Sequence, residues 1–191
     1  RHWQFAILPL MVLICLAANV NRYWTSAANR AAWSRLLEAS DYEGHFTTAQ
    51  TRYLYGTSAG QFNVLAWESI AESIPQPDHS AEVAALTLAQ KPDAERILVV
   101  GGGSYSICRR FAQFPTITNI TWLTTDPRYT RGLNKVVPPE LRLESGKTTM
   151  PRHEIKSYLR QNGDQYDLVV INLPDPDTLL LNRYFTTQFY E

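Results

Sequence analysis

One short stretch of the sequence has residue types suited to holding a ligand. Gly101, Gly102 and Gly103 follow the apolar run 97–100 and precede a segment with helical spacing. Glycine permits a tight turn and the close approach of a ligand, and free N–H groups at a helix start can bind polar ligand atoms. This bend, continued by Ser104, is typical of sites for a nucleotide or nucleoside.

An acidic residue follows the next apolar run. Asp126 stands about 20 residues after the glycine bend, where an acceptor for the ribose hydroxyls of a nucleoside is expected. The residues also allow a second interpretation, in which the glycines form only a tight turn and Asp126 caps a helix before Pro127. The pattern falls short of the GxGxxG fingerprint, because Ser104 and Ser106 stand where further glycines are expected.

The elements around these residues alternate between strand and helix from residue 96 onward. Strands are expected at 96–103, 117–126, 140–145 and 166–173, the last buried on both sides, and helices at 105–114 and 150–163, the second with Pro151 in its first turn. The alternation predicts an α/β fold with a parallel sheet and helices on both faces.

Ligands of such sheets bind beyond the carboxyl ends of the strands. The candidate binding residues that fall at these ends are Gly101, Gly102, Gly103, Ser104, Asp126, Ser145 and Gly146. The loop 172–177 falls there too, although on its own it also reads as a Pro-rich turn whose Asp177 or Thr178 caps the next helix.

A different pattern precedes the alternating region. Residues 44–69 are rich in Thr, Tyr, Phe and Val and are interrupted by 56–61, which predicts two or three antiparallel strands. A short helix is expected at 81–92, closed by Pro92.

The chain begins with a hydrophobic segment. Residues 3–21 carry no charge and would form roughly 28 Å of helix, close to the hydrocarbon thickness of a bilayer. Aromatic and basic residues follow, which predicts a transmembrane segment with its C-terminal side in the cytoplasm. A signal peptide cleaved near residues 15–19, or a core helix interrupted by Pro9, are the alternatives. An amphipathic helix should come next, either on the membrane surface or as a linker.

Composition limits the remaining possibilities. The chain has 191 residues, 45% of them hydrophobic, and its 18 basic and 18 acidic residues cancel, so nucleic acid is not expected as a partner. The cysteines and histidines lack metal-ligand spacing, and no metal site is predicted. The expected organisation is a hydrophobic segment, a linker helix, a small β region and a nucleoside-binding domain that continues in a longer protein, at 1–24, 25–43, 44–77 and 78–191.

Two motifs resemble those of the spermidine synthase family, the polyamine aminopropyltransferases. They are "ILVVGGG" at 97–103 and "YDLVVINLPDPDTLLLNRYFTTQFYE" at 166–191. The family carries a strand, a D-x-x-D-P loop and a helix ending in an aromatic pair. Here the loop 172–176 reads N-L-P-D-P, and 181–190 supply the helix. The likeness covers about 47–191, and the hydrophobic start is similar to that of the membrane-attached branch.

The resemblance implies a function. A domain of this kind has a Rossmann-like, methyltransferase-type fold and binds decarboxylated S-adenosylmethionine as a co-substrate, with no permanently bound cofactor. It passes the aminopropyl group to a diamine such as putrescine. By motif position Asp175 would hold the diamine, and Asp175 or Asp177 could accept its proton. The resemblance also implies association with a membrane, a domain in the cytoplasm and pairing of subunits through the β region.

The sequence departs from the family's pattern at four positions. Asn172 replaces the proton-accepting Asp, and an amide cannot take up a proton near neutral pH. The bend continues with 104–106 instead of Asp-Gly-Gly, Thr124 replaces the acid that holds the ribose, and Ser145 replaces the Asp of an Asp-Gly pair. Two other functions therefore stay open: a catalytically impaired adenosyl-binding or scaffold domain of a membrane protein, and another S-adenosylmethionine-dependent transferase such as a methyltransferase.

Overall fold

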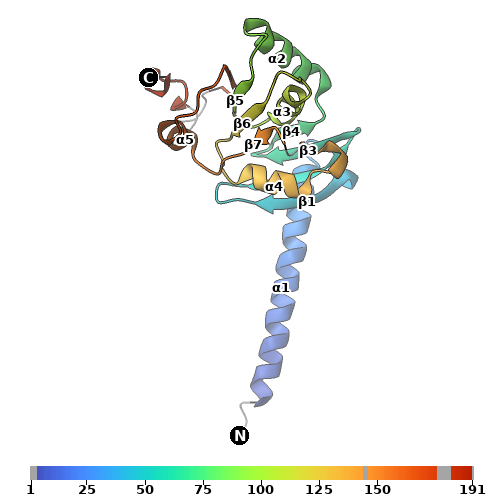
Figure 1. Ribbon diagram of the computed structural model, residues 1–191. Helices are drawn as coiled ribbons and strands as arrows, with labels where there is room; N and C mark the ends of the chain where they lie inside the picture. The colour runs from blue at the N-terminus through green and yellow to red at the C-terminus, as the bar shows by residue number, and fades with distance from the viewer. Residues whose placement is uncertain (1–3, 144–145, 176–181, 191) are drawn as a thin grey trace.

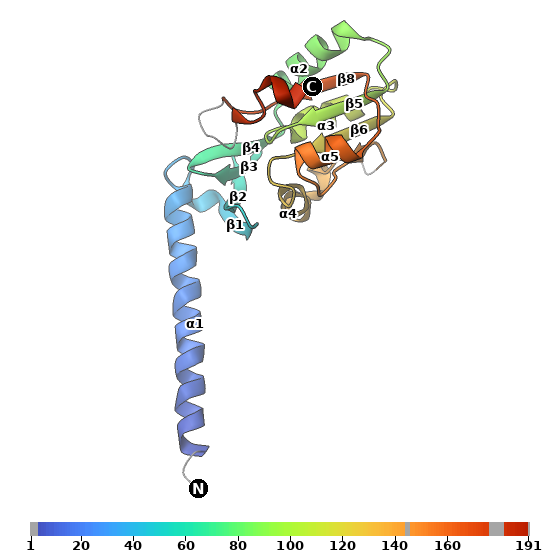
Figure 2. The ribbon, with the colours of Figure 1, turned by 90° about the vertical axis from the view of Figure 1, so that its left-hand side faces the viewer.

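The molecule consists of a long N-terminal helix and a domain built on two sheets (Figure 1). The computed structural model describes residues 4–143, 146–175 and 182–190. The antiparallel sheet lies next to the long helix, and the parallel sheet with its helices lies beyond it (Figure 2).

Helix α1 (Gln4–Trp33) projects from the domain as a single rod (Figures 1 and 2). It runs without a break across residues 24 and 25, where the hydrophobic segment and the linker helix were predicted to meet. Its last residue, Trp33, is fully buried against Leu54 and Leu65 of the antiparallel sheet. Within the part of the chain that the structure describes, no helix has the length and hydropathy needed to cross a membrane. The membrane-spanning segment stays a prediction.

The antiparallel sheet follows α1 and a short 3-10 turn, η1 (Ala39–Asp41). It has four strands in the order β1-β2-β3-β4 where two or three were predicted, namely β1 (Tyr42–Thr47), β2 (Arg52–Ser58), β3 (Gln61–Ala66) and β4 (Ser69–Ile74). A two-residue turn at Trp67 and Glu68, whose φ angles are 53° and 58°, connects β3 to the fourth strand, β4. Neither residue is a typical one for a left-handed turn, so the sequence gives no signal for this hairpin.

The parallel sheet confirms the predicted α/β fold. Its strands run in the order β7-β6-β5-β8, namely β5 (Arg96–Val100), β6 (Asn119–Leu123), β7 (Thr148–Thr149) and β8 (Leu168–Ile171). The helical elements are α2 (Pro77–Gln90), α3 (Tyr105–Ala112), α4 (Tyr129–Val136), η2 (Pro139–Leu141), α5 (Ile155–Gln161) and α7 (Thr187–Tyr190).

Helices cover both faces of the parallel sheet, as predicted. Ile97 and Val99 of β5 belong to the main core, which includes α3 and also the inner face of the antiparallel sheet. Leu98 and Val100 point the other way and pack in a second core with Ile155 of α5. This alternation follows from the two-residue period of a strand.

Three local predictions were wrong. The residues expected as a strand at 140–145 begin in the 3-10 turn η2, where two successive prolines, Pro138 and Pro139, fix the backbone and remove two donors. Helix α5 begins at Ile155 instead of near Pro151, because the Glu154 side chain caps it by accepting a hydrogen bond from the Ser157 N–H group at 3.0 Å.

Strand β8 was predicted to be buried on both sides. It is the edge strand of the described sheet, so its side chains alternate between half-buried and exposed positions, and Val169 is 54% exposed.

Candidate functional site

The glycine bend at the end of β5 is held by close backbone contacts. Gly101 has a φ of +125°, and a Cβ atom there would lie 1.8 Å from the carbonyl oxygen of Asn172. The Gly101 N–H donates to the Leu123 carbonyl at 2.8 Å, and the Trp122 indole donates to the Gly101 carbonyl at 2.7 Å. Only glycine fits this position, because both the dihedral angle and the approach of the neighbouring loop exclude a side chain.

Asn172 joins the bend to the end of β8. The strand order places β5 and β8 at the point where the sheet's connections reverse direction, which is where α/β sheets bind ligands. The Asn172 side-chain amide donates to the carbonyls of Gly102 and Gly103 at 3.2 and 3.3 Å and contacts the Ser104 hydroxyl at 3.1 Å. The amide therefore stabilises the bend itself.

Asp126 ties the two sheets together. It is 4% exposed, and its carboxylate accepts hydrogen bonds from the Thr48 hydroxyl, from the Tyr53 hydroxyl at 3.0 Å and from the Arg128 N–H group at 3.1 Å. Burial and the neighbouring carboxylate raise the pKa of Tyr53, so this phenol remains a donor at neutral pH. Asp126 thus anchors the β1–β2 hairpin to the start of α4.

Glu72 is a buried carboxyl group that sequence reasoning missed. It extends from β4, is 2% exposed, and accepts hydrogen bonds from the Tyr105 N–H group at 3.1 Å and the Tyr129 hydroxyl at 3.4 Å. Burial raises the pKa of Glu72 to about 8, although hydrogen bonds from Tyr105, Tyr129 and Gly103 act in the opposite direction. The available signal was its position two residues before the buried Ile74, on the inward face of the strand.

The structure thus brings some of the predicted site residues together and separates others. The glycine bend, Ser104 and Asn172 are in direct contact. Asp175 follows three residues after Asn172 and is exposed, and Gly146 is exposed beyond the other end of the sheet. Ser145 and Asp177 lie outside the described residues.

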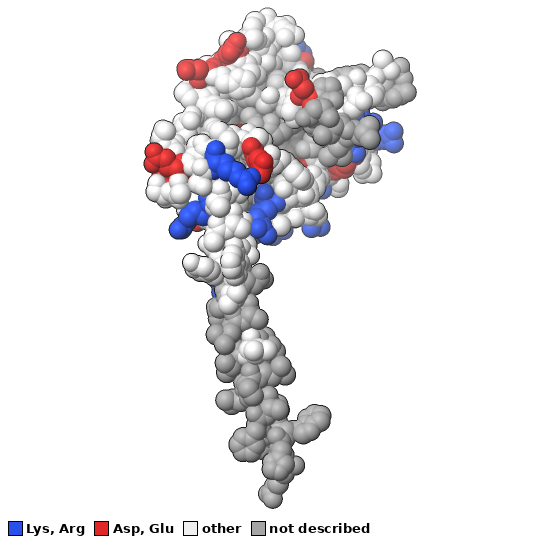
Figure 3. Space-filling view, turned by 180° about the vertical axis from the view of Figure 1, so that it is seen from behind, with Lys and Arg blue, Asp and Glu red and all other residues white. Residues whose placement is uncertain are grey.

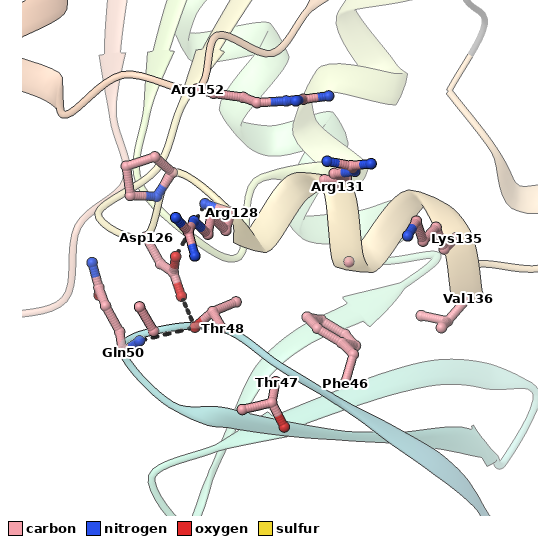
Figure 4. A pocket seen from close by; sticks show the side chains of 13 residues that line it. Phe46, Thr47, Thr48, Gln50, Asp126, Arg128, Arg131, Lys135, Val136 and Arg152 are labelled. Carbon is pink, nitrogen blue, oxygen red and sulfur yellow. Dashed lines mark hydrogen bonds between the residues drawn. The ribbon is translucent and has the colours of Figure 1, made fainter.

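Asp126 lines a pocket of about 830 Å³ between the β1–β2 hairpin and α4 (Figure 4). We call it the α4 pocket. Its lining residues are Phe46, Thr47, Thr48, Ala49, Gln50, Asp126, Pro127, Arg128, Arg131, Gly132, Lys135, Val136 and Arg152. The glycine bend is not among the residues that line this pocket.

Comparison with known proteins agrees with the fold. The sequence model of one protein family, the spermine/spermidine synthase domain, matches residues 79–191. Polyamine aminopropyltransferase 1 of Streptomyces coelicolor is 30% identical over 100 residues, covering 50% of this chain and 19% of that protein. Polyamine aminopropyltransferase of Agathobacter rectalis is 28% identical over 109 residues, covering 56% of this chain and 38% of that protein.

Solved structures of spermidine synthases share the architecture. One in complex with the transition-state analogue AdoDATO superposes with a TM-score of 0.66 at 13% identity, covering 78% of this chain and 52% of that one. The enzyme from Thermotoga maritima gives 0.59 at 10% identity, covering 69% and 48%. The chain thus spans about half the length of these two structures, and a smaller share of the length of the two polyamine aminopropyltransferases. Because the family model matches more than half of its residues, the chain belongs to the spermine/spermidine synthase family.

Proposed function

We propose that the protein transfers an aminopropyl group from decarboxylated S-adenosylmethionine to an amine acceptor such as putrescine. The observation that carries this proposal is the contact between the glycine bend after β5 and the loop after β8, at the reversal point of a sheet with the family's fold. An adenosyl co-substrate is expected beside the bend, and the amine beside the acidic part of the loop.

The protein contributes to this reaction mainly by positioning the amine acceptor and the aminopropyl donor. The acceptor's neutral amine attacks the aminopropyl carbon next to the sulfonium, the carbon–sulfur bond breaks, and its electron pair stays on sulfur, which gives methylthioadenosine. The new ammonium group then loses a proton. Carboxylates that attract and orient the amine lower the barrier by proximity and electrostatics.

Asp175 is the described residue best suited to this role. It is exposed, and the structure gives its side chain no hydrogen bond or ion pair with another described residue, so it is available to a cationic amine. Asn172 cannot serve as the base, because an amide does not bind a proton near neutral pH and its donors are already used on the bend. We therefore assign proton acceptance to Asp175, or to Asp177 in the same loop.

A second candidate function has its own support. The Asn172 amide is used on the bend, so position 172 offers no base for proton transfer. A domain that binds an adenosyl compound without turning it over is consistent with this contact.

The decisive experiment measures chemistry and binding separately. The full-length protein is incubated with decarboxylated S-adenosylmethionine and putrescine, and release of methylthioadenosine is followed by chromatography. We expect turnover, and we expect Asp175→Asn to reduce it by about 100-fold or more, since removal of a general base costs about 10²- to 10⁴-fold. Asp93→Asn is the matched control, because Asp93 is an exposed carboxylate just before β5, at the opposite end of the sheet.

Calorimetry with methylthioadenosine distinguishes the two candidates. Binding without turnover would support the non-catalytic adenosyl-binding domain. The absence of both binding and turnover would contradict both functions.

We also propose that α1 anchors the protein in a membrane, with the domain on the cytoplasmic side. The uncharged stretch 3–21 and the projection of α1 from the domain support this proposal (Figure 1). Tyr23 and Trp24, which follow the stretch, are 75% and 68% exposed, as interfacial aromatic anchors would be. Sedimentation of the full-length protein with membranes after alkaline washing tests it, and release into the supernatant would contradict it.

A further inference from the structure

The α4 pocket gathers four cationic side chains. Arg128 precedes the first residue of α4, and Arg131 and Lys135 follow at spacings of three and four, which places all three on one side of the helix. Arg152 joins them from the segment between β7 and α5 (Figure 4). All four residues are exposed and line the same pocket.

These cations have no anionic partner in the described structure. None of the four side chains makes an ion pair or hydrogen bond with another described residue, whereas Arg35, Lys91, Arg96 and Arg183 each pair with a carboxylate. Asp126, the carboxylate in the pocket lining, is buried and already accepts three hydrogen bonds. Like charges one turn apart destabilise a helix, so an anion bound here would relieve their repulsion.

Hydrogen bonds within the protein hold the other walls of the pocket in place. The Gln50 side chain donates to the Thr125 carbonyl at 2.9 Å, and Thr48 is tied to Asp126, so the hairpin is fixed against the start of α4. Phe46 and Val136 add an apolar surface to the lining. A volume of about 830 Å³ lies within the range of about 300–1,000 Å³ that is usual for small-ligand sites.

From this arrangement we propose that the α4 pocket binds the phosphate group of an ester that also carries an apolar part. Guanidinium and ammonium groups recognise phosphate through charge-assisted hydrogen bonds, and the apolar surface suits the esterified group. This site is separate from the glycine bend and does not depend on aminopropyl transfer.

Two sources can supply such a group: a soluble phosphate ester and an anionic lipid headgroup. Helix α4 and β1 lie toward the end of the domain from which α1 projects (Figure 1). In the opposite view, Lys and Arg side chains gather where α1 meets the domain (Figure 3). If α1 enters a membrane, the pocket lies on the part of the domain closest to the lipid.

The test uses the full-length protein and two kinds of probe. Glycerol 3-phosphate is titrated by calorimetry, and so are two short-chain lipids below their micelle concentration, dihexanoyl phosphatidylglycerol and, as its counterpart without net charge, dihexanoyl phosphatidylcholine. The double variant Arg131→Gln with Lys135→Gln removes two pocket cations. Arg110→Gln with Arg160→Gln is the control, since it removes the same charge from exposed positions on α3 and α5.

We expect at least one probe to bind, with an affinity that falls as salt is added. The pocket double variant should bind about tenfold more weakly or worse, as expected for the loss of charge-assisted contacts, and the control should bind normally. Binding of glycerol 3-phosphate identifies a soluble ester. Binding of dihexanoyl phosphatidylglycerol but not of dihexanoyl phosphatidylcholine, without binding of glycerol 3-phosphate, identifies a lipid.

The exchange of the two cations, Arg131→Lys with Lys135→Arg, keeps the charge and should retain binding, which separates loss of charge from loss of fold. The proposal is overturned if neither probe binds, or if the pocket variant and the control lose binding equally.

Discussion

At the scale of single residues, Asn172 shows how a substitution can change the role of a residue from catalytic to structural. A carboxylate at 172 would place its oxygens against the carbonyls of Gly102 and Gly103, where the amide now donates hydrogen bonds at 3.2 and 3.3 Å. Two acceptors at this distance repel each other, whereas the amide stabilises the bend. In this protein the side chain at 172 therefore supports the glycine loop.

Asn172→Asp is expected to destabilise the protein by about 1–3 kcal/mol near neutral pH, because a half-buried donor is lost and an unpaired charge replaces it. The loss should shrink in mild acid, since a protonated carboxyl group can again donate one hydrogen bond. Urea unfolding at the two pH values measures it. The same substitution at the exposed Asn182 is the control, and equal stability of both variants would contradict the structural role of Asn172.

Residue types in the sequence indicated some of the site residues, but not which residues contact one another in the fold. The glycine bend was predictable because three glycines after an apolar run have few other uses, and its φ angles of +125° at Gly101 and +69° at Gly103 bear this out. The role of Glu72 was not, since its burial depends on α3 and α4, which pack on β4 from far along the chain. The partners of Asp126 likewise come from a separate sheet.

At the scale of elements, the packing of the β1–β2 hairpin on α4 depends on one glycine. A Cβ atom at Gly132 would lie 2.3 Å from the Phe46 ring, which itself stacks on Tyr53 with ring centres 4.9 Å apart and so has little room to move. The helix accepts a residue of poor helical propensity because it lets the hairpin approach closely.

Gly132→Ala is expected to cost about 1–3 kcal/mol, because the clash with Phe46 outweighs the gain of about 1 kcal/mol in helix propensity. Thermal or urea unfolding measures the change. Gly163→Ala is the matched control, since a Cβ atom there meets nothing within 4 Å, and it should be neutral or slightly stabilising. A Gly132→Ala protein as stable as the wild type would show that the hairpin does not pack on α4 as described.

Elements were predictable where the pattern was strong and local. Strands β5 and β6 follow from apolar runs, and the parallel sheet follows from their alternation with helices. Strand β4 was not recognised because its turn uses Trp67 and Glu68 in place of glycine. The α4 pocket was not recognised either, because its walls come from three separate segments that only the fold brings together.

At the scale of the whole molecule, Glu72 links the two sheets through a group that titrates. Its carboxyl group extends from the antiparallel sheet to Tyr105 of α3 and Tyr129 of α4. Tyr105, Tyr129 and Cys108 are the titratable groups nearest to it, and the burial of each raises its own pKa, so all three stay uncharged at neutral pH. Glu72 is thus the member of this group that can change its charge in the accessible range.

The pKa of Glu72 is about 8 in the folded protein, against 4.5 as its ordinary value. The folded state then holds a proton that the unfolded state releases, so the stabilisation is complete below about pH 4.5 and is lost as the pH rises toward 8. The loss should approach about 1.4 kcal/mol per pH unit within this window.

Glu72→Gln keeps the shape and the acceptor but cannot ionise. The difference in unfolding free energy between the variant and the wild type should therefore grow in favour of the variant as the pH rises. Unfolding curves at several pH values measure this difference, and a difference that does not change with pH would contradict the raised pKa.

The main core has a consequence for how the chain can be divided. The match to the family model begins at residue 79, after the antiparallel sheet has ended, yet Phe62 and Ile74 of that sheet are fully buried in the same core as Ile107 and Phe111 of α3. A fragment cut where the likeness starts would leave that apolar surface bare to water and would be expected to aggregate. A protein expressed for study should therefore keep the antiparallel sheet, because the matched domain cannot be expected to fold without it.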